Sequence, residues 1–281
     1  MIEFANVSAS YGGGAPVLHD VSFSIDAGEF VAFVGTNGAG KSTTMRLVNG
    51  LLKPSSGQVS IDGVPTTALK TSELARRVGY LFQNPDSQIC CSTVRDELMF
   101  GFVAQGSAGA DAAARVDAII DDFGLDGDAD PFLLNRGMRQ LLALASIVVM
   151  EPPVIVLDEP TTGLDYRECM KVMEIVRALN GKGATVVMVC HDMEVVADFA
   201  RRVVVMDSGR VVDDGPTFEV LRNAKTLSEA SLVPPQVPAI SMALVAARSA
   251  LARSALAKAN TLDEMVDAVL AHARAKGAID E

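Results

Sequence analysis

A glycine-rich stretch, GTNGAGKST, follows the apolar run at residues 31–35 and leads into a helical pattern. It fits the pattern GxxxxGK[ST], in which glycines let backbone N–H groups curl around phosphate oxygens. Lys41 can reach the β and γ phosphates, and the Ser42 hydroxyl can ligate Mg²⁺. The sequence therefore predicts a site for a nucleoside triphosphate and Mg²⁺. Its predicted binding residues are Gly35, Thr36, Asn37, Gly38, Ala39, Gly40, Lys41, Ser42 and Thr43.

Two carboxylates, Asp158 and Glu159, stand at the end of the apolar run VIVLD. A carboxylate at the end of a buried strand is costly unless a cation or hydrogen bonds compensate it. We therefore expect Asp158 to hold Mg²⁺ and Glu159 to polarise the water that attacks the terminal phosphate. Phosphoryl transfer asks little covalent chemistry of the protein, so positioning and charge supply most of the catalysis.

Two further polar side chains follow apolar runs. Gln83 ends the run at 78–82, and its amide oxygen can ligate Mg²⁺ or a water molecule. His191 follows the run at 185–189, where a polar residue would project from the sheet edge toward the phosphates. The other two histidines, His19 and His272, have no such position and are interpreted as surface or core residues.

The chain elements that must position these residues alternate between strands and helices. Apolar runs bounded by Gly, Pro or charge are typical of strands buried on both faces of a parallel sheet. They lie at residues 31–35, 78–82, 154–158, 185–189 and 203–206. Helical patterns at 41–49 and 167–179 predict an α/β fold with helices covering the sheet. Residues 84–140 are helix-rich and are interpreted as a helical subdomain inserted into the α/β core.

In these motifs the chain resembles the ATPases of the ATP-binding cassette (ABC) family. GTNGAGKST, LFQNP, VIVLDEPTTGLD and VCHD, in this order, are similar to the Walker A, Q-loop, Walker B with D-loop, and H-loop motifs. The resemblance implies an ABC-type P-loop NTPase cassette over residues 1–224, ATP and Mg²⁺ as cofactors, and ATP hydrolysis as the reaction. It implies a second cassette as partner, adenine stacking by Tyr11, and a D-loop that includes Asp165. The implied catalytic residues are Lys41, Gln83, Glu159 and His191.

One motif departs from the family pattern. The signature LSGGQ of ABC proteins contacts the ATP bound by the opposite cassette, and LNRGM (134–138) takes its place here. Asn135 keeps an amide donor, Gly137 is retained ahead of a helix expected to begin at Met138, and Arg136 either adds a cation near the phosphates or hinders closure. This degenerate signature would act on the partner's nucleotide. It motivates the hypothesis of a heterodimer with unequal sites, and a homodimer stays open.

Three segments resemble the ATPases of energy-coupling factor (ECF) transporters: QNPDSQ (83–88), DELMFG (96–101) and LVPPQV (232–237). In that family two cassettes lie beneath a transmembrane T component and energise uptake of vitamins or transition-metal ions through a substrate-binding S component. The resemblance implies an ATP-hydrolysing motor subunit, bound peripherally at the cytoplasmic face of the membrane. Asp86, Asp96 and Glu97, taken as exposed carboxylates, would suit a groove that receives arginine-bearing coupling helices.

Composition excludes several other roles. A net charge of −11 argues against nucleic-acid binding and against adhesion to anionic lipid, because both need clustered Lys and Arg. No apolar run reaches the roughly 18 residues of a membrane span, and the N-terminus does not resemble a secretory signal. The four cysteines show no CxxC spacing and are interpreted as incidental or buried thiols.

Residues 225–281 are predicted to form a helical C-terminal extension. Thr261 and Glu264 resemble a capping box, and apolar residues recur after them at helical spacing. The extension either packs on the protein's own surface or mediates self-association.

Two other functions remain open. A soluble ABC ATPase acting on ribosomes or DNA is disfavoured by the acidic charge and the single cassette. A regulatory ATP-binding protomer with weak turnover is disfavoured by Asp158, Glu159 and His191. The transported substrate does not follow from this sequence, because in such systems another polypeptide selects it.

Overall fold

A six-stranded sheet forms the centre of the protein, and we describe it from a computed structural model that covers residues 1–247 and 255–275. The strand order is β10-β9-β3-β8-β7-β6, and all neighbours are parallel except β10 with β9. The strands are β3 (Phe30–Val34), β6 (Val78–Leu81), β7 (Val154–Asp158), β8 (Thr185–Val189), β9 (Arg202–Asp207) and β10 (Arg210–Pro216). The first five coincide with the predicted apolar runs, which confirms the parallel sheet.

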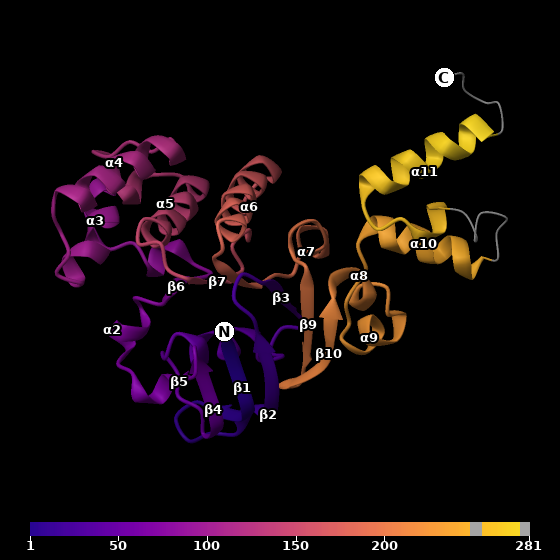
Figure 1. Ribbon diagram of the computed structural model, residues 1–281, viewed down its shortest axis with the longest axis horizontal. Coiled ribbons are helices and arrows are strands. Elements are labelled where there is room, and N and C mark those ends of the chain that lie inside the picture. The colour runs from indigo at the N-terminus through magenta and orange to yellow at the C-terminus, as the bar shows by residue number, and fades with distance from the viewer. Residues whose placement is uncertain (248–254, 276–281) are drawn as a thin grey trace.

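A second, antiparallel sheet with the order β2-β1-β4-β5 lies beside the first (Figure 1). Its strands are β1 (Ile2–Ser10), β2 (Pro16–Ile25), β4 (Ser56–Ile61) and β5 (Val64–Pro65). One apolar cluster joins this sheet to helix α1 (Lys41–Val48) and to one face of the six-stranded sheet. Within it, Phe23 stacks on Phe4 at 4.4 Å between ring centroids and meets Phe33 edge-on at 5.2 Å. The strand that precedes the glycine-rich loop is thereby fixed in a packed core.

Helices cover the other face of the six-stranded sheet through a second apolar cluster. Three of them, α3 (Val94–Ala104), α4 (Ala110–Phe123) and α5 (Arg136–Val148), group at one side of the molecule, as Figure 1 shows. Helix α5 begins at Arg136, two residues before the expected start at Met138, because Asn135 caps it by accepting a hydrogen bond from Met138 N at 2.8 Å. The short helix α2 (Thr71–Leu74) precedes β6, and α6 (Tyr166–Gly181) and α7 (Met193–Phe199) follow β7 and β8.

The C-terminal part of the chain packs at the opposite side of the molecule from α3, α4 and α5 (Figure 1). Its helices are α8 (Thr217–Val220), α9 (Ala224–Glu229), α10 (Gln236–Ala246) and α11 (Leu262–Ala275). The guanidinium of Arg222 donates to Ala257 O at 2.7 Å and to Asn260 Oδ1 at 2.7 Å, which ties the segment before α11 to the end of α8. Residues 248–254 and 276–281 of the predicted extension lie outside the described residues.

Helix α11 has an exposed apolar side. Leu262, Val266, Val269 and Leu270 are each more than a third exposed. Thr261 Oγ1 accepts a hydrogen bond from Glu264 N at 3.3 Å, as the capping motif predicts. None of the described helices combines the length and the apolar character that crossing a bilayer requires.

Candidate nucleotide site

The glycine-rich loop joins β3 to α1 at the carboxyl edge of the parallel sheet. Gly35 has φ +141°, and a side chain there would collide with Met206 O, so the tight exit from β3 requires glycine. Lys41 is almost fully buried, and its ammonium donates to Gly35 O at 2.7 Å and Thr36 O at 2.9 Å. Burial lowers the pKa of Lys41, and the charges of Glu159 and Asp158 oppose that shift. The lysine therefore already lies inside the loop that is predicted to hold phosphates.

Asp158 and Ser42 meet as the sequence predicts. Ser42 Oγ donates to Asp158 Oδ1 at 3.0 Å, although the two residues are 116 positions apart. Tyr80, which the sequence analysis does not single out, donates its hydroxyl to Asp158 Oδ2 at 3.1 Å. Burial raises the pKa of Asp158, and these two hydrogen bonds counteract it. Burial also raises the pKa of Tyr80, so its hydroxyl stays a donor. Tyr80 lies within a buried strand, where an aromatic residue normally serves packing. Its hydroxyl is the only sequence signal that could have indicated a role in the site.

Glu159 is held on both carboxylate oxygens. Gln83 Nε2 donates to Oε2 at 2.7 Å and Thr162 Oγ1 donates to Oε2 at 3.0 Å, while His191 Nε2 lies 2.7 Å from Oε1. The backbone of Glu159 has φ +52°, a left-handed conformation that costs a non-glycine residue roughly 1 kcal/mol or more. Its N–H compensates by donating to Val189 O at 3.0 Å across the sheet edge. Three strand ends thus hold one carboxylate in a fixed direction.

A cavity of about 420 Å³ brings these groups together. It is lined by residues of the glycine-rich loop and by the side chains that follow β6, β7 and β8. The lining residues among the predicted set are Asn37, Gly38, Gly40, Lys41, Ser42, Thr43, Gln83, Glu159 and His191. Tyr11 lies beside this loop, with its hydroxyl 3.2 Å from Thr43 Oγ1 and Arg46 6.0 Å from its ring centroid. Tyr11 is 42% exposed as a residue, which is compatible with the predicted stacking on adenine.

Arg136 binds the D-loop segment of its own chain. Its Nε and Nη2 donate to Thr162 O at 3.3 Å and 3.0 Å, and its side chain covers Gly163. Thr162 is also the residue whose hydroxyl binds Glu159. The guanidinium is therefore engaged within this chain, against the D-loop. Whether it adds a cation near the partner's phosphates or hinders closure stays a prediction.

The missing side chain of Gly137 lets another residue approach the backbone closely, and in this structure that residue is Glu168 of the same chain. A Cβ at this position would lie 1.9 Å from Glu168 Oε1 at the start of α6. Glu168 and Asp165 form a capping box there, with Asp165 Oδ1 accepting from Glu168 N at 2.9 Å. One turn further along α5, Gln140 donates to Pro160 O at 3.0 Å. The start of α5 is thus tied to the segment 160–168 at three points.

The expected acidic groove after the Q-loop needs correction. Glu97 is buried, and its Oε2 accepts from Cys90 N at 2.9 Å and Cys91 N at 2.8 Å, so it is no exposed carboxylate. Asp86 and Asp96 are exposed, as expected, but each has a partner in this chain: Asp86 pairs with Arg139 at 3.2 Å, and Asp96 accepts from Thr93 Oγ1 at 2.8 Å. The groove itself, about 370 Å³, has largely apolar walls. They include Leu51, Phe82, Phe100, Ala104 and Met150.

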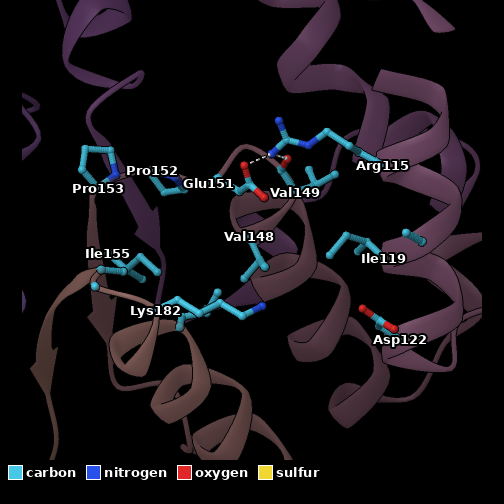
Figure 2. A pocket seen from close by; sticks show the side chains of 14 residues that line it. Arg115, Ile119, Asp122, Val148, Val149, Glu151, Pro152, Pro153, Ile155 and Lys182 are labelled. Carbon is cyan, nitrogen blue, oxygen red and sulfur yellow. Dashed lines mark hydrogen bonds and ion pairs between the residues drawn. The ribbon is translucent and has the colours of Figure 1, made fainter. Parts of the chain in front are cut away.

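A further cavity of about 530 Å³ lies between α4 and the loop before β7 (Figure 2). Pro152 and Pro153 line it where β7 begins, so it opens at the opposite edge of the sheet from the nucleotide residues. Arg115 closes one side by pairing with Glu151 at 2.9 Å and donating to Val149 O at 2.7 Å, as Figure 2 shows. Because it lies at the opposite edge of the sheet, this cavity takes no part in the candidate site.

The parallel sheet, the glycine-rich loop and the carboxylates at the strand ends define a P-loop ATPase cassette. Residues 18–162 match the model of the family described as ABC transporter. The energy-coupling factor transporter ATP-binding protein EcfA of Methanothermobacter thermautotrophicus is 38% identical over 236 residues, covering 83% of this chain and 76% of the relative. The chain belongs to the ABC transporter family.

Other relatives are longer than this chain. An ABC transporter ATP-binding protein of Caldanaerobacter subterraneus is 40% identical over 243 residues, which cover 86% of this chain and 43% of that protein. The chain likewise spans 36% and 40% of two proteins from Methanosarcina species. It therefore corresponds to about two fifths of the length of these relatives.

Solved structures confirm the ABC cassette fold. The structure of cbiO1 from Clostridium perfringens, described as part of the ABC transporter complex cbiONQ, superposes with a TM-score of 0.72 at 31% identity and covers 85% of this chain and 97% of that chain. An ATP-binding cassette solved as a dimer in a post-hydrolysis state, bound to ADP and Pi, gives a TM-score of 0.69 at 30% identity and covers 77% of this chain and 99% of that chain.

Proposed function

We propose that this chain is the ATP-hydrolysing motor subunit of an ECF-type ABC importer. The observation that carries the proposal is the Glu159 carboxylate, which Gln83, Thr162 and His191 hold at the edge of the cavity that also contains Lys41 and Ser42. The named similarity to EcfA proteins and to cbiO1 supports the transport role. The domains would be the cassette at residues 1–224 and the helical extension at 225–281.

Glu159 would act on the attacking water. Its two oxygens are oriented by donors from three strand ends, so the carboxylate needs no reorganisation before it accepts or polarises a proton. His191 holds Oε1, and Gln83 and Thr162 hold Oε2. Lys41, already desolvated inside the loop, would neutralise charge on the phosphates.

The donor set fits Mg²⁺. Ser42 Oγ, Asp158 Oδ1 and the amide oxygen of Gln83 are oxygen ligands of the kind that Mg²⁺ prefers, and Asp158 is buried without a cationic partner among the described ion pairs. A Mg²⁺ ion held by these oxygens would supply positive charge that offsets the negative charge of the nucleotide phosphates. Tyr80 keeps the Asp158 carboxylate aimed by binding its second oxygen.

The signature segment would serve both cassettes of a dimer. Asn135 uses its side-chain oxygen as the helix cap, so its amide N–H₂ has no partner among the described residues and can donate to the partner's nucleotide, aided by the positive end of α5. Arg136 points the other way and positions this chain's own Glu159 through Thr162. A homodimer and a heterodimer both accommodate this arrangement.

The membrane partners would dock at the apolar groove after the Q-loop. Leu51 and Phe100 are about half exposed at its rim, which fits the side chains of an amphipathic helix. We propose a transmembrane T component and a substrate-binding S component as those partners and the cytoplasmic membrane face as the location. Vitamins and transition-metal ions are the cargo classes of this kind of importer.

Copurification and turnover test the proposal. The tagged chain should copurify in detergent with a second cassette and with membrane proteins, and the isolated complex should release phosphate from ATP. Glu159→Gln should lower turnover of this chain's site at least about 100-fold while ATP binding is retained, because the carboxylate acts on water and the loop binds the nucleotide. Unchanged turnover, or association with nucleic acid in place of membrane proteins, would contradict it.

A further inference from the structure

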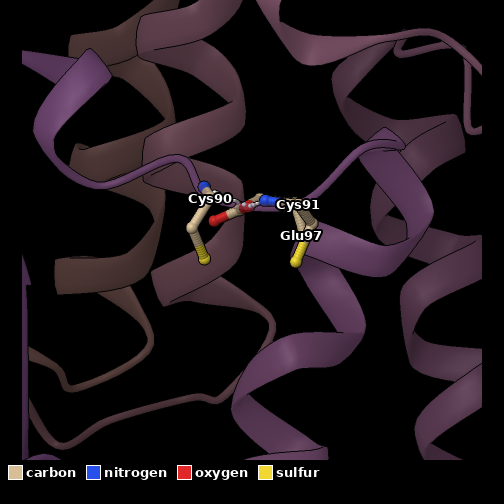
Figure 3. A group of neighbouring side chains, drawn as sticks. All are labelled: Cys90, Cys91 and Glu97. Carbon is tan, nitrogen blue, oxygen red and sulfur yellow. Dashed lines mark hydrogen bonds between the residues drawn. The ribbon is translucent and has the colours of Figure 1, made fainter.

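Two adjacent thiols and a buried carboxylate meet between the Q-loop and α3. Cys90 is exposed, Cys91 is partly buried, and Glu97 belongs to the first turn of α3. One ligand atom from each residue lies within 4.8 Å of the other two. Figure 3 shows the Glu97 carboxylate beside both cysteines.

The carboxylate is fixed but retains a free oxygen. Glu97 is 4% exposed, and Cys90 N and Cys91 N both donate to its Oε2, which clamps the loop onto the helix. Its Oε1 has no N–H donor among the described residues, and a carboxylate oxygen of Glu97 lies within 4.8 Å of both sulfur atoms. Among the described ion pairs, none neutralises Glu97; the adjacent Arg95 pairs with Asp117 instead. A buried carboxylate without a countercharge favours a cation.

The two sulfur atoms are soft ligands, and they determine which divalent ions the site would prefer. Two thiolates and one carboxylate suit Zn²⁺ or Cd²⁺, since thiolates discriminate against Mg²⁺ and Ca²⁺. Tetrahedral bonds of about 2.3 Å from zinc to sulfur place two sulfur atoms about 3.8 Å apart, so the ligands need move by only about 1 Å to close. Water can take the fourth position, because Cys90 is exposed.

A disulfide between the two cysteines is the alternative, and the backbone disfavours it. Neighbouring Cα atoms in a trans peptide lie about 3.8 Å apart, below the roughly 4.4–6.8 Å of ordinary disulfides. A shared metal ion imposes no such bond between the sulfur atoms. From this juxtaposition we propose that Cys90, Cys91 and Glu97 form a binding site for a thiophilic divalent ion, Zn²⁺ or Cd²⁺, distinct from the nucleotide site.

Binding is coupled to proton release. Burial, together with the nearby Glu97 carboxylate and Cys90, raises the pKa of the Cys91 thiol to about 12, so the thiol is protonated at neutral pH. An incoming ion forms two metal–sulfur bonds, and two thiol protons pass to solvent, leaving the carboxylate as the third ligand.

Cadmium titration of the full chain tests the site. The wild type should bind one Cd²⁺ per chain with a thiolate-to-metal charge-transfer band, and Zn²⁺ should displace it. Cys90→Ser/Cys91→Ser should remove the band and weaken binding at least about 100-fold. Glu97→Gln keeps an oxygen for the two N–H donors and should weaken binding about 10-fold. Cys169→Ser is the matched control and should bind like the wild type.

Several outcomes of these titrations would overturn the proposed metal site. A band that persists in the double serine variant, or that disappears in Cys169→Ser, overturns the proposal, and so does Glu97→Gln with unaltered affinity. Protection of Cys90 and Cys91 from alkylation by one equivalent of Cd²⁺ provides a second measurement on the unmodified protein, and full reactivity of both thiols under saturation would refute the site. The test uses no ATP, so its result is independent of the proposed transport function.

Discussion

Replacing Arg136 tests whether the signature segment acts on this chain's own catalytic carboxylate. Arg136 donates two hydrogen bonds to Thr162 O, and the Thr162 hydroxyl donates to Glu159 Oε2. Arg136→Ala removes the guanidinium and keeps a residue that favours the first turn of α5. Arg136→Lys keeps a positive charge and loses the forked donor geometry.

The expected effect is small but measurable. A hydrogen bond from a charged donor contributes about 1.5–3 kcal/mol when buried, and this pair is exposed, so we take about 1 kcal/mol for the whole contact. If that free energy is lost from the orientation of Glu159 in the transition state, turnover falls about 5-fold. Arg136→Lys should fall nearly as far as Arg136→Ala, because the fork carries the contact and a point charge replaces it poorly.

Phosphate release by the assembled complex is the assay, and a double-mutant cycle assigns the site. Where the partner cassette is a separate polypeptide, Glu159→Gln leaves only the partner's turnover. Arg136→Ala should then add no further loss, since its effect acts through Glu159 of the same chain. The Michaelis constant for ATP should stay close to that of the wild type, because the hydrogen bonds of Arg136 to described residues go to Thr162 and not to the glycine-rich loop.

Two results would refute this reasoning. If Arg136→Lys keeps full activity while Arg136→Ala loses activity, the positive charge matters and the forked donor geometry of arginine does not. A loss caused by Arg136→Ala in the Glu159→Gln background would show that Arg136 acts on the partner's nucleotide.

Two further predictions concern packing and pH. Gly137→Ala should lower the melting temperature by about 2–4 °C, since its Cβ meets the Glu168 carboxylate and disrupts a capping box of about 1 kcal/mol. In a Glu168→Ala background, which already lacks that carboxylate, Gly137→Ala should cause little further loss; an equally large further loss would contradict the clash. Burial raises the pKa of Asp158, so its contribution to stability is present below the unfolded pKa of Asp and is lost as pH rises through the folded pKa. Asp158→Asn should therefore raise the melting temperature of the nucleotide-free protein at neutral pH, with a difference that shrinks on acidification to about pH 4, and it should abolish stabilisation by Mg²⁺ with ATP; a lower melting temperature at neutral pH would show that the ionised carboxylate is compensated.

Local sequence patterns predicted the parallel sheet and the ends of its strands. An apolar run indicates a buried strand and a glycine-rich run indicates a tight loop, and neither conclusion needs information from distant segments. The same rule placed Glu159 and His191 at neighbouring strand ends, where they meet at 2.7 Å. Contacts between distant segments did not follow. Whether Arg136 faces a phosphate or Thr162 depends on how α5 docks against α6, and a polar residue in a helical pattern does not specify that.

Glu97 shows a second limit of sequence reasoning. Its position in DELMFG suggested an exposed carboxylate, because charged residues in the first turn of a helix are usually solvated. The loop at Cys90 and Cys91 folds back over it and supplies two N–H donors, which compensate its burial. Adjacent cysteines without a CxxC spacing likewise gave no metal signal, because the third ligand arrives only through the fold.

The residues at the start of α5 differ in what they contact, which bears on how the altered signature would act in a dimer. The amide N–H₂ of Asn135 has no partner among the described residues, while Arg136, Gly137 and Gln140 bind or pack against the segment 160–168. A movement of this turn toward a partner's nucleotide must therefore displace Thr162, and Thr162 holds Glu159. In the proposed dimer, closure of one nucleotide site would then set the catalytic carboxylate of the other. In that proposed dimer, the contacts of Arg136 and Gly137 would strengthen the link within the chain, and the N-terminus of α5 would still face the partner's nucleotide.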